Sequence, residues 1–116
     1  MLAACTLATG ARAGDAYPER SVRVVIGTPA GSTTDFLYRA LQDAVREELG
    51  QPIVIENRPG ADQLLAARQV AGAAGDGYTL LAATRTQVAV NPVTYANPGY
   101  DADRDLVPVT LLAYQI

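Results

Sequence analysis

Residues 22–35 read Val22-Arg23-Val24-Val25-Ile26-Gly27-Thr28-Pro29-Ala30-Gly31-Ser32-Thr33-Thr34-Asp35. The β-branched first part predicts a buried strand, and the small residues after it predict a loop that leads into a helix. Ser32, Thr33 and Thr34 are all candidate N-caps, with Asp35 in the first helical turn. Such a loop presents free backbone N–H groups at the carboxyl edge of a parallel sheet, where open α/β folds bind ligands. The same residues also suit an ordinary strand-to-helix turn, so both interpretations stay open at this point.

The remainder of the chain continues the alternation of strand and helix. Apolar spacing predicts helices over about 34–49 and 62–73, and strands over 52–56, 78–83 and 106–114. Residues 88–91 predict a short helix stopped by Pro92, and residues 95–105 predict a loop. This order implies an α/β fold with a right-handed, doubly wound parallel sheet.

Composition narrows the possible functions. The chain has 116 residues, 49% of them hydrophobic and 18% charged, which indicates one globular domain. All nine cations are Arg, they are scattered, and the net charge is −3, so nothing favours a nucleic-acid partner. The sequence contains no His and no Lys, which excludes a His-based triad, a His metal site and a Lys Schiff base within this chain.

Sequence motifs for catalysis are also missing. The phosphate loop, the dinucleotide fingerprint and the nucleophile elbow are absent, and the acids at 101, 103 and 105 are typical of a solvated loop. We therefore predict no enzyme activity, no metal and no cofactor. What remains is a binding module for a small anion, with backbone N–H groups and hydroxyls at two strand ends.

The N-terminal residues predict export. Residues 1–13 are small and apolar and end in Ala11-Arg12-Ala13, an A-x-A cleavage pattern before Gly14. We interpret them as the remnant of a secretory signal peptide. A plain N-terminal tail is the second interpretation. A lipid anchor at Cys5, after Leu2-Ala3-Ala4, is the third. No segment reaches the length of a membrane span.

Six motifs, in order, resemble those of the Bug family, the solute receptors of tripartite tricarboxylate transporters. They are Tyr-Pro-Glu-Arg-Ser-Val-Arg-Val-Val at 17–25, Pro-Ala-Gly-Ser-Thr-Thr-Asp at 29–35, Leu-Gly-Gln-Pro at 49–52, Glu-Asn-Arg-Pro-Gly-Ala at 56–61, Asp-Gly-Tyr-Thr-Leu-Leu at 76–81 and Pro-Val-Thr-Leu at 108–111. The resemblance covers about residues 17–113, and six motifs in the right order are highly specific.

The resemblance implies a type II periplasmic binding protein. Two α/β lobes of such a protein close on a small carboxylate, often through water-mediated contacts, and deliver it to a membrane permease. Family members are more than twice this length, so residues 14–116 would be an incomplete N-terminal lobe, with the second lobe absent from this chain. The alternatives are a stand-alone α/β interaction module, which could self-associate through its open sheet edge, and a truncated product without function.

In the family, the first and third strand-end loops line the ligand cleft. The candidate ligand-binding residues are therefore Thr28, Pro29, Ala30, Gly31, Ser32, Thr33, Thr34, Thr84, Thr86 and Gln87. We expect Arg58 to serve the turn after the second strand and not to clamp a carboxylate.

Several residues depart from the family pattern. Gly27-Thr28 stand where Pro-Phe is usual, which removes an apolar wall, and Ser32 replaces a Gly. Asp62-Gln63 replace Gly-Gly, and Ala66 replaces a further Gly. We expect the charge of Asp62 to stabilise a helix start and to repel an approaching anion.

Overall fold

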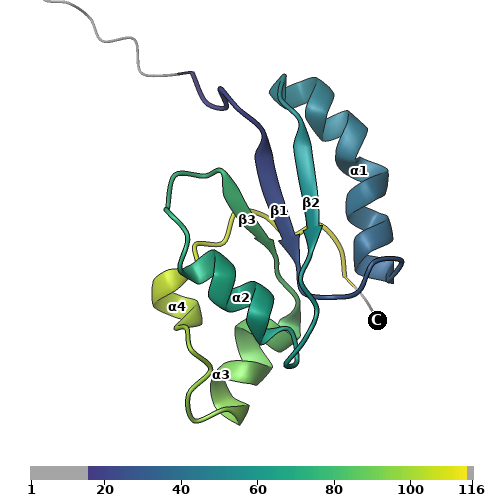
Figure 1. The fold of residues 1–116 in the computed structure, drawn as a ribbon. Helices are drawn as coiled ribbons and strands as arrows, with labels where there is room; N and C mark the ends of the chain where they lie inside the picture. The colour runs from purple at the N-terminus through teal and green to yellow at the C-terminus, as the bar shows by residue number, and fades with distance from the viewer. Residues whose placement is uncertain (1–15, 115–116) are drawn as a thin grey trace, which may run out of the picture.

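Residues 22–26 form the central strand of the sheet, as their sequence predicts. In the computed structural model, which describes residues 16–114, β1 (Val22–Ile26) lies between β2 (Ile53–Asn57) and β3 (Thr79–Ala82) (Figure 1). Both neighbours pair parallel to β1, and Val24 lies opposite Ile55 and Leu80. A central strand is covered on both faces, which explains why β1 is almost wholly apolar. The predicted signal remnant, including Cys5, lies outside the described residues.

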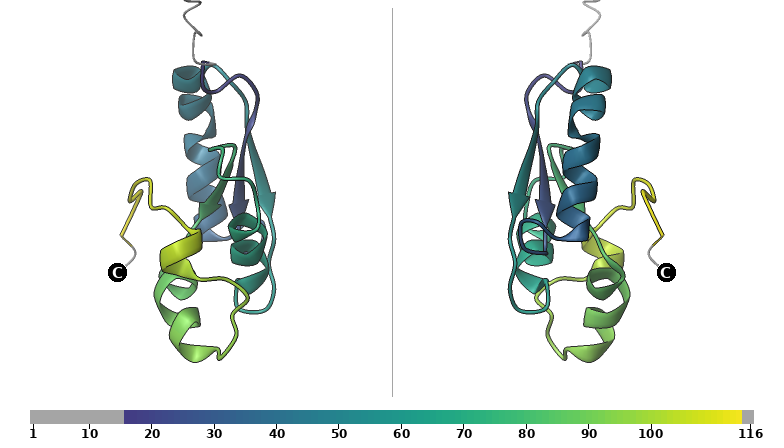
Figure 2. Two further views of the ribbon diagram at one scale, coloured as in Figure 1. Left: turned by 90° about the vertical axis from the view of Figure 1, so that its left-hand side faces the viewer. Right: turned by 90° about the vertical axis from the view of Figure 1, so that its right-hand side faces the viewer.

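Helix α1 (Thr33–Leu49) covers one face of the sheet (Figure 2). Its start is set by Ser32, whose Oγ accepts a hydrogen bond from the Asp35 backbone N–H at 3.3 Å. Tyr38 and Leu49 pack against a buried cluster that β1 and β2 dominate. The helical spacing of the apolar residues from Phe36 to Leu49 predicts Phe36 on the inner face of α1. This prediction is wrong, because Phe36 is 73% exposed. It lies in the first turn, beyond the part of α1 that meets the sheet.

Gly50 ends α1 in the left-handed conformation, with φ +70°. A Cβ added at Gly50 would meet nothing within 4 Å, so only backbone strain opposes a side chain. We expect Gly50→Ala to destabilise the protein by about 1 kcal/mol, or a fall in Tm of about 4–8 °C. Gly75→Ala is the matched control, because the surroundings are equally open and the φ is not positive. Equal losses in the two variants, measured by thermal denaturation, would contradict this account of the helix end.

Helix α2 (Leu64–Ala71) covers the other face, where Leu64 and Ala67 form a buried cluster with Tyr100. The predicted start at residue 62 is wrong. Ala61, Asp62 and Gln63 have φ values of 48°, 50° and 67°, so three consecutive residues adopt the left-handed region and cannot belong to a right-handed helix.

The chain after β3 is more helical than predicted. The π-helical turn η1 (Thr86–Val90) runs directly into α3 (Asn91–Thr94), and α4 (Ala102–Asp105) lies within the predicted loop. Pro92 does not stop the helix, because it lies in the first turn of α3, where a missing N–H costs little. The Asp101 carboxylate caps α4 by accepting hydrogen bonds from the backbone N–H groups of Asp103 and Arg104.

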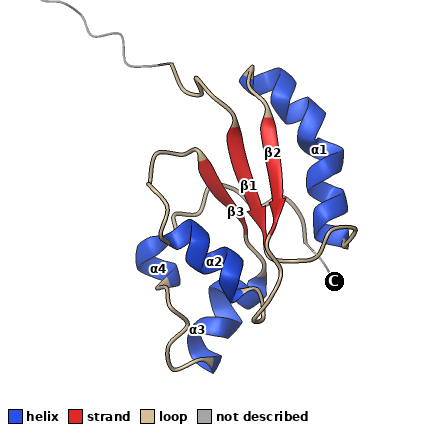
Figure 3. Ribbon diagram, viewed as in Figure 1, coloured by secondary structure: helices blue, strands red, loops and turns tan. Residues whose placement is uncertain are grey.

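Residues 106–114 do not form the predicted fourth strand. They are coil, and within residues 16–114 no strand lies beside them to complete a ladder (Figure 3). Leu106 packs on the α2 side of the sheet, whereas Leu112 lines a small apolar cavity of about 110 Å³ beneath α1. The segment therefore passes from one face of the sheet to the other. None of the helices in the described region is long and apolar enough to cross a membrane.

Candidate ligand-binding site

The carboxyl ends of the three parallel strands bring three loops to one edge of the sheet (Figures 1 and 3). The loops occupy residues 27–32, 58–63 and 83–85. Parallel strands place their carboxyl ends together, so loops far apart in sequence become neighbours. Both predicted ligand loops, the first and the third, lie at this edge.

The first loop is closed by its own polar groups. The Thr28 and Ser32 hydroxyls lie 2.7 Å apart, and Gly31 turns the chain with φ +83°. The Gly31 N–H, which the sequence suggested would be free for a ligand, donates to Asp35 Oδ2 at 2.8 Å. The backbone N–H groups of Thr33 and Thr34, at the start of α1, have no acceptor within residues 16–114. These two groups are therefore the donors that this loop offers to an anion.

Asp35 holds the first loop to the end of β2. Its carboxylate is 3% exposed and accepts hydrogen bonds from Arg39 Nε at 3.0 Å and from Asn57 Nδ2 at 2.9 Å. Asn57 also donates to the Thr28 carbonyl, which ties the end of β2 to the loop after β1. The bonds from Arg39, from the Gly31 N–H and from Asn57 lower the pKa of Asp35 to about 2. The arginine of this network is therefore already paired inside the protein.

Gln63 and Gln87 connect the second and third loops. Thr84 Oγ1 donates to Gln63 Oε1 at 2.9 Å, and the Thr84 backbone N–H donates to Gln87 Oε1 at 2.9 Å. Gln87 is fully buried, and its Nε2 donates to the Gln63 carbonyl at 3.3 Å. Gly27 lies against both glutamines: a Cβ added there would be 2.7 Å from Gln63 Cβ and 2.9 Å from Gln87 Nε2. The space above the end of β1 is therefore filled by these two side chains.

The left-handed turn at 61–63 is fixed from the helical segment that follows β3. Asn91 Nδ2 donates to the Asp62 carbonyl at 2.9 Å, and the Tyr95 hydroxyl donates to the Asp62 carboxylate. This hydrogen bond raises the pKa of Tyr95 above its ordinary value. Asp62 does not begin α2, so the expected stabilisation of a helix start does not arise. Its carboxylate is exposed at the same edge of the sheet.

The predicted site residues fall into three groups by exposure. Pro29, Ala30, Gly31 and Thr33 are exposed at the edge, whereas Thr28, Ser32, Thr34, Thr84 and Thr86 are half-buried there. Gln87 is buried, with both ends of its amide used by the protein, so it supports the loops. Arg58 contributes its backbone N–H to the Ile26 carbonyl at 2.7 Å, while its side chain is exposed.

Three residues that shape the site were not among the predicted ones: Asp35, Asn57 and Gln63. The four-residue spacing of Asp35 and Arg39 on α1 could have revealed their pairing. Only the three-dimensional pairing of β2 with β1 brings Asn57 to Asp35. The usual Gly-Gly of the family at residues 62 and 63 could have signalled the left-handed conformation, although Gln63 itself does not favour it.

The fold is shared with solved solute-binding proteins. The structure of periplasmic binding protein BugD matches with a TM-score of 0.67 and 38% identity, covering 74% of this chain and 28% of that one. R. palustris Rpa4515 with adipate matches with a TM-score of 0.70 and 38% identity, over 75% of this chain and 29% of that one. MatC from Rhodopseudomonas palustris with bound malate gives a TM-score of 0.54 and 46% identity, over 56% and 22%. The class is thus that of periplasmic binding proteins, of which the described residues form part of one α/β domain.

Sequence comparison identifies the family. Residues 37–115 match the family described as the tripartite tricarboxylate transporter family receptor. A UPF0065 protein of Bordetella bronchiseptica is 38% identical over 116 residues, which is 98% of this chain and 35% of that protein. The chain belongs to the tripartite tricarboxylate transporter receptor family, and the predicted resemblance to Bug receptors is confirmed. It spans about a third of the length of the curated relative.

Proposed function

We propose that the chain forms part of the ligand-binding lobe of a periplasmic receptor. The receptor binds a small carboxylate at the carboxyl edge of the sheet and delivers it to the membrane permease of a tripartite tricarboxylate transporter. It has no catalytic activity of its own. Two solved relatives, R. palustris Rpa4515 with adipate and MatC with bound malate, support a dicarboxylate as the ligand.

One observation carries this proposal: the start of α1 is open at the edge where the three loops meet. The unpaired N–H groups of Thr33 and Thr34 lie next to the hydroxyls of Thr28 and Ser32. A 17-residue helix adds the positive end of its dipole at this point. Arg39 is neutralised by Asp35, so the first loop offers N–H groups and hydroxyls rather than a free guanidinium.

Titration of the ¹⁵N-labelled chain with adipate and with malate, followed by NMR, tests the proposal. We expect saturable shifts of the Thr33 and Thr34 amide signals at millimolar concentration, because a single lobe leaves the ligand in contact with water and weakens each hydrogen bond. Dimethyl adipate, which has the same chain without the charges, is the control and should shift neither signal. Shifts that are absent with both acids in the folded protein would remove this edge as the site.

Substitutions at two glycines distinguish an effect on ligand binding from an effect on stability. Gly31 and Gly50 both have positive φ, and an added Cβ meets nothing within 4 Å at either position. We expect Gly31→Ala and Gly50→Ala to lower the Tm by similar amounts, about 4–8 °C. Only Gly31→Ala should weaken the adipate-induced shifts, because it alone alters the first loop. Equal carboxylate affinity in both variants would take the first loop out of the site.

We also expect the chain to self-associate, because residues 106–114 expose several apolar side chains. Val107, Val109 and Leu111 are 85%, 78% and 64% exposed, and β2 and β3 are both edge strands. Light scattering over a range of concentrations tests it. A monomer at all concentrations would rule out the stand-alone interaction module.

A further inference from the structure

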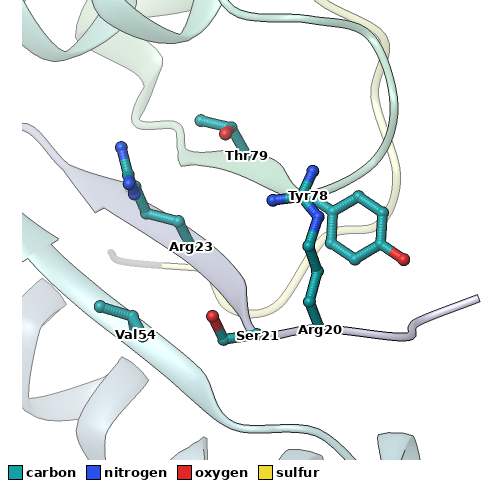
Figure 4. A pocket seen from close by; sticks show the side chains of 6 residues that line it. All are labelled: Arg20, Ser21, Arg23, Val54, Tyr78 and Thr79. Atoms are coloured by element: carbon teal, nitrogen blue, oxygen red, sulfur yellow. The ribbon is translucent and has the colours of Figure 1, made fainter.

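We propose that a second anion site lies at the opposite, amino-terminal edge of the sheet and binds a small oxyanion of the phosphate and sulfate type. A cavity of about 160 Å³ is found there, lined by Arg20, Ser21, Arg23, Val54, Tyr78 and Thr79 (Figure 4). Arg23 is the second residue of β1, and Thr79 is the first residue of β3, directly opposite Arg23. This site is separate from the proposed carboxylate site, at the other ends of the same strands.

The charges around the cavity are arranged for an anion. Its charged lining residues are both arginines. Asp76 pairs with Arg20 at 3.1 Å and Glu56 pairs with Arg23 at 3.6 Å, but neither acid lines the cavity. An Arg side chain carries five N–H donors, and a single contact to a carboxylate oxygen leaves most of them available. Asp76 takes up one N–H donor of Arg20, and the 3.6 Å pair of Arg23 with Glu56 is longer than a hydrogen bond, so both guanidinium groups keep N–H donors for the cavity.

Arg20, whose side chain is 64% exposed, is oriented by contacts with Tyr78 and Asp76. The centre of its guanidinium lies 3.9 Å from the centre of the Tyr78 ring, in a cation–π contact. The Tyr78 hydroxyl accepts a hydrogen bond from the Glu19 backbone N–H at 2.9 Å, which holds the chain just before Arg20. These contacts limit the conformations of Arg20, so it loses less freedom on binding a ligand than an arginine without them.

Two hydroxyls complete the polar lining. Figure 4 shows the four polar side chains around one opening, with Arg23 and Arg20 on opposite sides and Ser21 and Thr79 between them. The Arg23 backbone N–H donates to the Tyr78 carbonyl at 2.8 Å, so the starts of β1 and β3 form one rigid frame. Phosphate and sulfate offer several oxygens, which match the forked donors of arginine and the O–H groups.

General charge attraction does not explain such a site, because the whole chain has a net charge of −3. Arg39, Arg46 and Arg104 each pair with an acid of their own helix. The inference therefore depends on Arg20 and Arg23 lying around one cavity, and not on the overall composition.

The test is an NMR titration of the labelled 116-residue chain with sodium phosphate and, separately, with sodium sulfate. Sodium chloride at equal ionic strength is the control. The side-chain Nε–H signals of Arg20 and Arg23 and the amide signal of Thr79 report on the cavity. We expect saturable shifts with the two oxyanions and none with chloride. Shifts that rise linearly, or that chloride reproduces, would overturn the proposal, because they would show only a diffuse ion atmosphere.

Arg23→Gln should weaken oxyanion binding about tenfold or more, since it removes a charge-assisted hydrogen bond. Arg46→Gln is the matched control, with the same change of charge at an exposed pair on α1, and should leave the affinity unchanged. If Arg23→Gln fails to fold, Thr79→Val and Ser21→Ala remove one hydroxyl each and should still weaken binding. Unchanged affinity in the folded cavity variants would overturn the proposal. The adipate-induced shifts of Thr33 and Thr34 are read independently, so either site can fail without the other.

Discussion

Asp35→Ala is expected to lower the Tm by at least about 10 °C. The buried carboxylate accepts hydrogen bonds from the Gly31 N–H, from Arg39 and from Asn57, and alanine would leave all three donors without this partner. A hydrogen bond to a charged group contributes about 1.5–3 kcal/mol, more than a bond between neutral groups, and three such bonds are lost together. The first loop and the end of β2 would separate, so carboxylate binding should be lost together with stability.

Asp43→Ala is the control for this variant. Asp43 also lies on α1, but its side chain is 86% exposed and is paired only weakly, at 3.7 Å from Arg46. Exposed pairs of this kind contribute little, so a fall in Tm below about 3 °C is expected. Thermal denaturation of both variants tests this expectation. A similarly small fall in Tm in both would show that the hydrogen bonds of Asp35 do not stabilise the fold.

The same carboxylate predicts how stability changes with acid. Its pKa is about 2 in the folded protein, below the ordinary value of 3.8. A lowered pKa stabilises the fold at pH values above the ordinary one, and this contribution disappears as the pH falls from about 4 towards 2. In Asp35→Asn no proton can bind at this position, so the difference in stability between this variant and the unaltered chain should shrink over that range. A constant difference, measured by urea denaturation, would contradict the assignment.

The sequence predicted the three strands of the sheet and α1 because local signals and tertiary packing agree there. The β-branched run of β1 suits a central strand, and Ser32 and Gly50 mark the two ends of α1 by simple capping chemistry. The prediction that the loops after β1 and β3 lie at one edge of the sheet followed from the parallel order of the strands alone. For the loops after β1 and β3, the predicted site residues lie at the expected edge, and their role in binding stays a prediction.

In other parts of the chain, the structure depends on contacts between residues far apart in sequence, and the sequence alone does not reveal these contacts. Residues 106–114 have the composition of a strand, but a strand requires a partner along its edge. Gln87 carries the polar chemistry of a ligand contact, yet its burial beneath the second loop assigns both of its amide groups to the protein. The turn at 61–63 is left-handed because Gln87 and Asn91 hold its carbonyls, which overrides the preference of Ala, Asp and Gln.

Gly27→Ala is the second variant with a large expected effect, a loss of about 2 kcal/mol of stability. The added methyl group would lie 2.7 Å from Gln63 Cβ, an atom fixed to the backbone of a turn that Gln87 and Asn91 hold. Neither side of the contact can move without breaking these hydrogen bonds. The familiar preference of glycine for unusual backbone angles plays no part, because Gly27 does not have a positive φ. The cause is therefore steric.

A double-mutant cycle with Gln63→Gly isolates this contact. Gln63→Gly removes the two closest carbon atoms and relieves the left-handed strain at φ +67°, although the hydrogen bond from Thr84 is lost. In this background the two contacts with Gln63 are gone and the contact with Gln87 Nε2 at 2.9 Å remains, so Gly27→Ala should cost about 1 kcal/mol, about half of its cost in the unaltered chain. We expect a coupling energy of at least about 1 kcal/mol between the two positions, measured by urea denaturation. Additive effects would show that Gln63 does not fill the space above Gly27. The two departures from the family pattern, at 27 and 63, would then be independent rather than complementary.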